Sequence, residues 1–319
     1  MAIVYVNTKK HLKDILGFSQ YIFKPDPNFE NYKLITILGE NHVQHYDCND
    51  STKDTITVEN FILRTPNVKT HIVLETLENI KDTAGSYNMQ NIFKTLRESD
   101  PLKIKNISTA FLDHRYSFLD PNYLYWLYHD VDKIISLPNN IIIEQYITPF
   151  YDKIATLSKY YEGEVYLPLV NIMYDNYLPI VDATFSNLLK AISTIWDVTD
   201  PENKKKILYD IRKSWVQVCD FYVMREIFKV NDINEYIILI GNNHSININE
   251  YFKNVLCEPI GRETFFCEIV QTKNMTNAIS TKFNCISLNN TLKVVENAEG
   301  KRTADFDICK KRNLSKMYG

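Results

Sequence analysis

The sequence predicts an α/β fold: a single domain with a central, mostly parallel β-sheet flanked by helices, and a large helical insertion before the last core strand. Short apolar runs alternate with longer helix-like segments, the pattern of strand–helix–strand units. The runs at 34–38 and 236–240 are apolar almost throughout, which is typical of parallel strands buried on both faces. Between 119 and 230 the patterns are helical, and this stretch is the expected insertion or cap.

The remaining elements follow from local patterns along the chain. Strand-like runs are expected, in order, at 3–6, 34–38, 71–75, 108–112, 236–240, 264–270 and 284–288. Helix-like segments are expected near His11 to Leu16, then at 55–64, 89–98, 140–161, 180–196, from Pro201 to about 230, and at 246–256. Pro201 is suited to the first turn of a helix, where its missing N–H is not needed. The single α/β domain is expected to span 1–299, and 300–319 to form a polar tail.

Composition excludes some classes of protein. The 319 residues carry a net charge of −3, which argues against broad nucleic-acid binding, since that requires a basic surface. No window approaches 18 uninterrupted apolar residues, so no membrane insertion is expected. The N-terminus lacks the features of a signal peptide, and the six cysteines are dispersed without metal-binding spacing. We therefore expect an intracellular, cytoplasmic protein with reduced thiols.

One short pattern occurs twice. The strand-like run at 34–38 leads into Gly39-Glu40-Asn41-His42, and the run at 236–240 leads into Gly241-Asn242-Asn243-His244. With eight glycines and seven histidines in the whole chain, two chance matches to GxxH at strand ends are rare. A strand-end glycine permits close approach of a ligand to the backbone. A histidine at the start of a helix lies near the positive end of its dipole, which favours the neutral imidazole needed for metal ligation or general-base catalysis.

Other chemically active side chains also follow predicted strands. Because the carboxyl ends of parallel strands meet at one edge of a sheet, these side chains are expected to share a site. The candidates are Gly39, Glu40, His42, Glu75, Asp113, Arg115, Gly241 and His244. Structural alternatives remain open: a strand-end histidine can be a hydrogen-bonded structural residue, Glu40 can complement a helix dipole, and Asp113 can pair with Arg115.

These motifs resemble the TIKI/TraB/ChaN-like and erythromycin esterase-like superfamily. The resemblance rests on the two GxxH motifs, on Glu75 at the end of the second core strand, on Asp113 after the third, and on Arg225-Glu226 in a helix before the second motif. It departs from the family pattern in that glutamate stands at 226 in place of the usual Asp or Asn. The methionine that often follows that pair is also missing.

The resemblance implies a hydrolase of a small-molecule or peptide substrate, cleaving an ester or amide bond with an activated water. In a metal-dependent version, His42, Glu75 and His244 hold a divalent ion such as Mn²⁺, Co²⁺ or Zn²⁺, which lowers the pKa of the water. In a metal-free version, one histidine is the general base, a carboxylate such as Glu40 or Glu75 orients it, and Arg225 stabilises the oxyanion. A non-catalytic ligand-binding protein, for haem or a similar ligand, and an interaction protein derived from this fold are the alternatives.

Overall fold

A computed structural model describes the parts of the chain on which the fold rests. The described residues are 2–23, 33–41, 54–64, 67–75, 87–99, 101–111, 131–142, 144, 183, 186, 187, 190, 194, 200–228, 232–252, 266–271 and 285–296. The chain divides into two compact units, one formed by 1–112, 167–170 and 229–319 and the other by 113–166 and 171–228.

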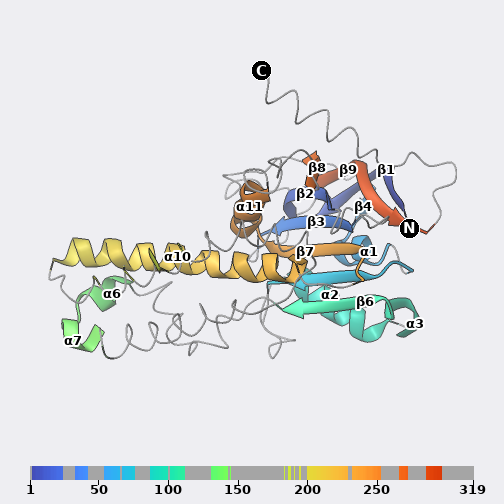
Figure 1. Ribbon diagram of the computed structural model, residues 1–319. Coiled ribbons are helices and arrows are strands. Elements are labelled where there is room, and N and C mark those ends of the chain that lie inside the picture. The colour runs from blue at the N-terminus through green and yellow to red at the C-terminus, as the bar shows by residue number, and fades with distance from the viewer. Residues whose placement is uncertain are drawn as a thin grey trace, which may run out of the picture. The chain divides into compact units, whose positions relative to one another are not determined.

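The first unit is built on a mixed six-stranded sheet, so the protein is of the α/β class (Figure 1). Across the sheet the strands lie in the order β6 (Ile107–Phe111), β5 (Thr70–Leu74), β7 (Glu235–Gly241), β3 (Lys33–Glu40), β2 (Ile15–Phe23) and β8 (Phe266–Gln271). The first four are parallel to one another. β2 runs antiparallel to both of its neighbours, β3 and β8.

The two central strands explain the apolar runs in the sequence. Every residue of β3 and of β7 is buried. Strands in the middle of a parallel sheet are covered on both faces, so they need apolar side chains at nearly every position. β7 lies between β3 and β5, although it is far from both in sequence.

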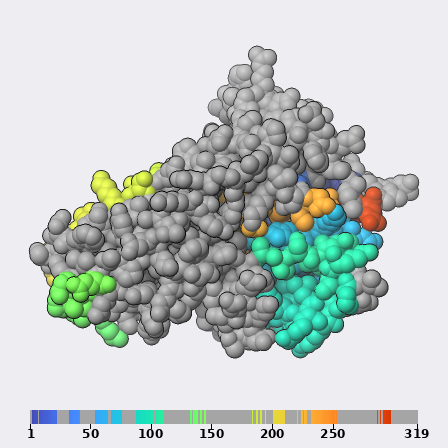
Figure 2. All heavy atoms as spheres, turned by 60° about the horizontal axis from the view of Figure 1, so that its bottom comes forward, coloured from blue at the N-terminus to red at the C-terminus, as the bar shows by residue number. Residues whose placement is uncertain are grey.

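A second sheet and two helices cover one face of the large sheet. The second sheet has the order β4 (Thr55–Ile56), β1 (Ala2–Lys13) and β9 (Cys285–Val295), and the helices are α1 (Val58–Ile62) and α2 (Tyr87–Glu98). A short helix, α3 (Pro101–Ile104), follows α2 in the chain. One hydrophobic cluster joins β1, β9, α1 and α2 to the large sheet through side chains such as Leu12, Leu38, Phe61, Met89 and Ile286. Figure 2 shows residues of 87–111, in teal, gathered on one face of the molecule beside light-blue and orange residues from other parts of the first unit.

Helix α11 (Asn242–Tyr251) packs on β3, β2 and β7. The hydroxyl of Tyr21 on β2 donates to Asn249 Oδ1 at 2.7 Å. The ring of Tyr21 meets that of Phe252 edge-on, with centroids 4.8 Å apart. Because Tyr21 and Phe18 alternate along β2 and Phe18 belongs to the cluster on the opposite face, α11 covers the other side of the sheet.

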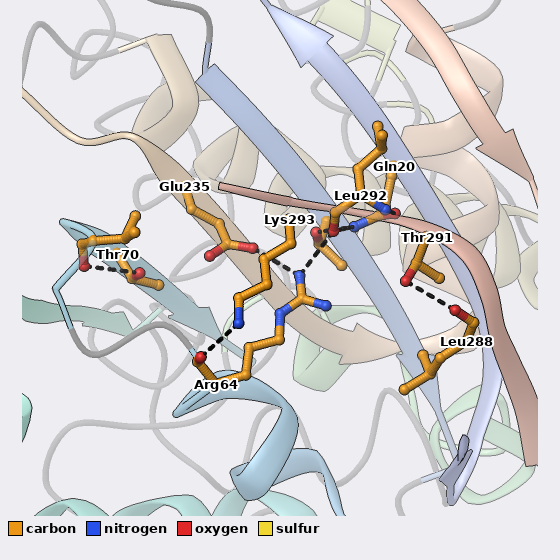
Figure 3. A network of polar contacts seen from close by, with 10 residues as sticks. Gln20, Arg64, Thr70, Glu235, Leu288, Thr291, Leu292 and Lys293 are labelled. Atoms are coloured by element: carbon orange, nitrogen blue, oxygen red, sulfur yellow. Dashed lines mark hydrogen bonds and ion pairs between the residues drawn. The ribbon is translucent and has the colours of Figure 1, made fainter. Parts of the chain in front are cut away.

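A buried polar network ties β9 to the large sheet (Figure 3). Gln20 on β2 exchanges two hydrogen bonds with the backbone of Leu292, at 2.7 and 3.0 Å. Arg64 Nη2 donates both to Glu235 and to the Leu292 carbonyl, each at 3.0 Å, and Lys293 donates to the Arg64 carbonyl. The ends of the two sheets are thus connected by charge-assisted hydrogen bonds in a largely buried setting.

The second unit contains α6 (Val131–Ile135), α7 (Asn139–Ile142) and the long helix α10 (Pro201–Phe228). α10 begins as the sequence predicts: the Asp200 carboxylate accepts from the N–H of Asn203 at 3.0 Å, and Pro201 occupies the first turn. Lys205 on α10 donates to Asp132 on α6 at 2.7 Å. None of the helices in the described ranges combines the length and the apolar character that crossing a membrane requires.

One local expectation is wrong, and the bounds of another differ from those expected. The helix-like stretch from His11 to Leu16 is the end of β1 and the start of β2, joined at Asp14 with φ of 63°. A tight turn brings the end of β1 and the start of β2 onto the same core, so Leu12 and Ile15 are both buried although they lie on different strands. Their separation of three residues imitates the spacing of a helix. The helix expected at 246–256 begins earlier, at Asn242, so His244 lies inside its first turn.

Candidate functional site

The two GxxH motifs lie side by side at the carboxyl ends of adjacent strands. In the parallel pairing of β3 with β7, Gly39 lies opposite Ile240 and Glu40 opposite Gly241. The second motif is therefore displaced by one residue along the sheet relative to the first. Sequence segments about 200 residues apart thus contribute to one edge.

β5 reaches the same edge on the other side of β7. The N–H of Glu75, just beyond β5, donates to the Leu239 carbonyl at 3.1 Å. After β5 the chain continues to β6, at one edge of the sheet. After β7 it passes through α11 and continues to β8, at the other edge. Neighbouring strands whose connections diverge define a topological switch point, and ligands of open α/β sheets bind outside the carboxyl ends of such strands. Glu75 and His244 stand at this point.

Glu75 and His244 form the central contact of the site. Glu75 Oε1 lies 3.2 Å from His244 Nε2, and Glu75 Oε2 accepts a hydrogen bond from the Gly241 N–H at 2.7 Å. The side chains of His244 and Glu75 are only 9% and 7% exposed. A carboxylate with so little access to water needs such partners, since an unpaired buried charge is strongly destabilising.

This contact fixes the orientation of the imidazole. A carboxylate only accepts hydrogen bonds, so a hydrogen bond within this pair requires the proton to be on His244 Nε2. In the neutral ring the basic nitrogen is then Nδ1. Glu75 is in turn held by the backbone at the N-terminus of α11, where the helix dipole favours a negative charge. The pair resembles the acid–histidine half of a general-base site.

Gly39 allows α11 to lie close against the end of β3. A Cβ atom at this position would lie 2.4 Å from Ser245 Oγ and 2.7 Å from Asn242 Oδ1. Ser245 Oγ itself donates to the Asn242 carbonyl at 2.7 Å within the first turn of α11. A side chain at Gly39 would therefore displace the turn that carries His244. This explains why the first motif requires glycine.

Glu40 lies on the other face of the sheet from Gly39, because side chains alternate along a strand. It is 1% exposed, and its Oε2 accepts a hydrogen bond from Asn88 Nδ2 on α2 at 2.8 Å. Two buried carboxylates thus flank the end of β7, Glu40 from the β3 side and Glu75 from the β5 side. The sequence did not single out Asn88 or Ser245, because neither belongs to a motif or to a strand end.

Four of the predicted site residues are not placed relative to this edge. His42, Asp113 and Arg115 lie outside the described residues. Arg225 belongs to α10 in the second unit, and its side chain lies outside the described part. The described structure therefore brings together Gly39, Glu40, Glu75, Gly241 and His244.

The described residues include two of the three side chains that the sequence predicts as metal ligands. Among them, no group of three or more His, Cys, Asp or Glu side chains is arranged to hold a metal ion. Glu75 and His244 are two of the three predicted ligands, and their carboxylate oxygen and imidazole nitrogen suit Mn²⁺, Co²⁺ or Zn²⁺. The third, His42, follows β3 two residues beyond Glu40.

Comparisons with known proteins give no relative on which to base an assignment. No family model matches the chain, and neither a curated protein nor a solved structure matches it significantly. The chemistry of the site must therefore be argued from its residues.

Proposed function

We propose that this protein is a hydrolase that cleaves an ester or amide bond with a water molecule activated at the Glu75–His244 pair. The observation that carries the proposal is the contact of His244 Nε2 with Glu75 at 3.2 Å, at the switch point of the sheet. The motif resemblance to the TIKI/TraB/ChaN-like and erythromycin esterase-like superfamily supports the same reaction class.

In the proposed reaction, His244 Nδ1 accepts a proton from water as the oxygen attacks the carbonyl carbon of the substrate. Glu75 holds the ring in place and stabilises the imidazolium that forms. The tetrahedral intermediate then collapses, the bond to the alcohol or amine breaks, and the leaving group takes the proton from His244. We assign oxyanion stabilisation to Arg225, as the motif resemblance implies.

A divalent ion is part of the proposal as an option. If His42, Glu75 and His244 bind one, it supplies a water of lowered pKa and a Lewis acid. The roles of the protein residues are then ligation and orientation, because a carboxylate beside a histidine also fixes the tautomer of a metal-bound imidazole.

We further propose that the chain forms a single α/β domain in which 119–230 is a helical insertion. The last core strand of the parallel set, β7, follows this insertion in sequence.

The test is a hydrolysis screen of neutral esters and short peptides with the full chain. His244→Ala should lower kcat/KM by about 10²–10⁴-fold, the usual contribution of a general base. Glu75→Gln should lower it by about 10–100-fold, since it orients the base. His71→Ala, which removes a histidine from the opposite end of β5, is the matched control and should stay within about threefold of wild type.

Metal dependence is measured in the same screen. Elemental analysis of the purified protein, and activity before and after dialysis against a chelator, separate the two versions of the site. A wild-type protein that turns over none of the substrates would overturn the hydrolase proposal. A Soret band on addition of haem, without hydrolysis, would favour the ligand-binding alternative.

A further inference from the structure

We infer that Asn88 is a positioning residue of this site: its amide holds the Glu40 carboxylate in place at the end of β3. The inference rests on the proposed function, because it assigns Asn88 a role in the same reaction. It adds a residue from α2 to a site that otherwise comes from strand ends and α11.

The contact itself is well defined. Asn88 Nδ2 lies 2.8 Å from Glu40 Oε2, and the two residues are 6% and 1% exposed. They are separated by 48 positions in sequence, so the bond joins two elements rather than stabilising a local turn. A hydrogen bond to a charged group is stronger than one between neutral groups, so this contact is suited to fixing the orientation of the carboxylate.

The position of Asn88 is fixed by its neighbour. Met89 is fully buried in the cluster that also contains Leu38, and Leu38 projects to the same face of β3 as Glu40. The packing of Met89 therefore brings the first turn of α2 against the end of β3. Asn88 is the polar residue that this packing presents to the carboxylate.

The contact matters for the site because Glu40 is paired with the second motif. Glu40 lies opposite Gly241 in the sheet, and the Gly241 N–H is the donor that holds Glu75. The Glu40 carboxylate lies on the α2 face, so its contact with Asn88 acts through the backbone: it holds the end of β3 that pairs with Gly241, whose N–H holds Glu75 beside His244. Asn88 thereby fixes one carboxylate of the two that flank β7.

Asn88→Asp gives a test with a distinctive dependence on pH. The substitution keeps the shape of the side chain but replaces the donor by a carboxylate next to a buried carboxylate. Two carboxylates at this distance cannot both be ionised, so they share a proton or separate. At low pH the shared proton restores the hydrogen bond, whereas at high pH repulsion turns Glu40 away.

We therefore expect kcat/KM of Asn88→Asp, relative to wild type at each pH, to be about tenfold lower at pH 8 and within about twofold at pH 5. Asn88→Ala should be lowered about tenfold at both pH values. Gln90→Glu is the matched control, since it adds the same charge to the first turn of α2 at an exposed position. Its relative activity should not change with pH.

Urea unfolding of the same variants tests the Asn88–Glu40 contact separately from its effect on catalysis. The folded Asn88→Asp variant binds a proton that the unfolded chain has released, so its stability relative to Gln90→Glu should fall as pH rises from 5 to 8. A fall in stability with no pH dependence of relative activity would overturn the positioning role and leave the hydrolase proposal intact. Absence of the stability effect would overturn the contact, and a wild type without any hydrolysis would overturn both proposals.

Discussion

The two ends of β7 carry buried charges that are held in different ways. At the amino end, Glu235 is fully buried and receives a hydrogen bond from Arg64, which also binds the Leu292 carbonyl. At the carboxyl end, Glu75 accepts a hydrogen bond from the Gly241 N–H and forms an ion pair with His244. Each pair joins β7 to an element distant in sequence.

The difference lies in the cation. A guanidinium does not gain or lose protons in proteins, so the Arg64–Glu235 pair can only connect structure. An imidazole is the side chain whose ordinary pKa lies nearest to neutral pH, so a carboxylate–imidazole pair is of a kind that can take part in proton transfer. β7 thus has a carboxylate–guanidinium pair at its amino end and a carboxylate–imidazole pair at its carboxyl end.

Arg64→Met should be the most destabilising change at the amino end. It leaves Glu235 buried without its cation, which costs about 3–5 kcal/mol of the free energy of unfolding measured in urea. Arg97→Met, at an exposed position on α2, is the control and should change stability by less than about 0.5 kcal/mol. The double variant Arg64→Met/Glu235→Gln should recover part of the loss, and a purely additive loss would contradict the coupling.

Gly39→Ala tests the close approach at the carboxyl end. The added methyl group would collide with Ser245 Oγ, so we expect a loss of about 2 kcal/mol and a displacement of the first turn of α11. Because this turn carries His244, kcat/KM should also fall. Adding Ser245→Ala removes the nearest atom and should restore part of the stability. A Gly39→Ala variant as stable as wild type would show that α11 does not lie this close to β3.

The smallest effect is expected at Lys33, which begins β3 and lies over the ring of Tyr236, with 5.5 Å between the ammonium nitrogen and the ring centroid. Burial lowers the pKa of Lys33 from 10.5 to about 8, partly offset by Asp232, which raises it. Above pH 8 the folded protein loses this proton while the unfolded chain keeps it, so stability should rise with pH.

The expected gain at Lys33 is about 1 kcal/mol between pH 7 and 9. Comparison with Lys33→Met, measured by urea unfolding over the same range, removes the contributions of other groups. The gain should be present in wild type and missing in the variant. Equal pH profiles of wild type and Lys33→Met would show that folding does not lower the pKa of Lys33.

The central strands could be predicted from sequence because their burial leaves an unambiguous pattern. β3, β5, β6 and β7 lie within about one or two residues of the runs expected for them. The strand order could not be predicted, because nothing local in β7 specifies that it inserts between β3 and β5. β2 was missed altogether, since its apolar residues beside Asp14 imitate helical spacing.

The site was predictable to the extent that it follows from strand ends. Glu75 and His244 were expected at one edge, and the structure places them in contact. The side chains that hold this edge in place, Asn88 and Ser245, could not be recognised, because their roles arise from packing between helices and the sheet. A single sequence contains no local signal for such contacts.

The place of β7 in the sheet has a consequence for folding during synthesis. β3 and β5 emerge early, yet their shared neighbour is encoded about 160 residues after β5. Until 235–241 have been made, the nascent chain has two strands with unpaired edges facing a missing partner, the arrangement most prone to mispairing. The pairing of β7 with β3 and β5 joins residues that are far apart in sequence, and such contacts slow folding. The same late event brings Glu75 and His244 together, so the proposed site can form only after the central strand has been inserted.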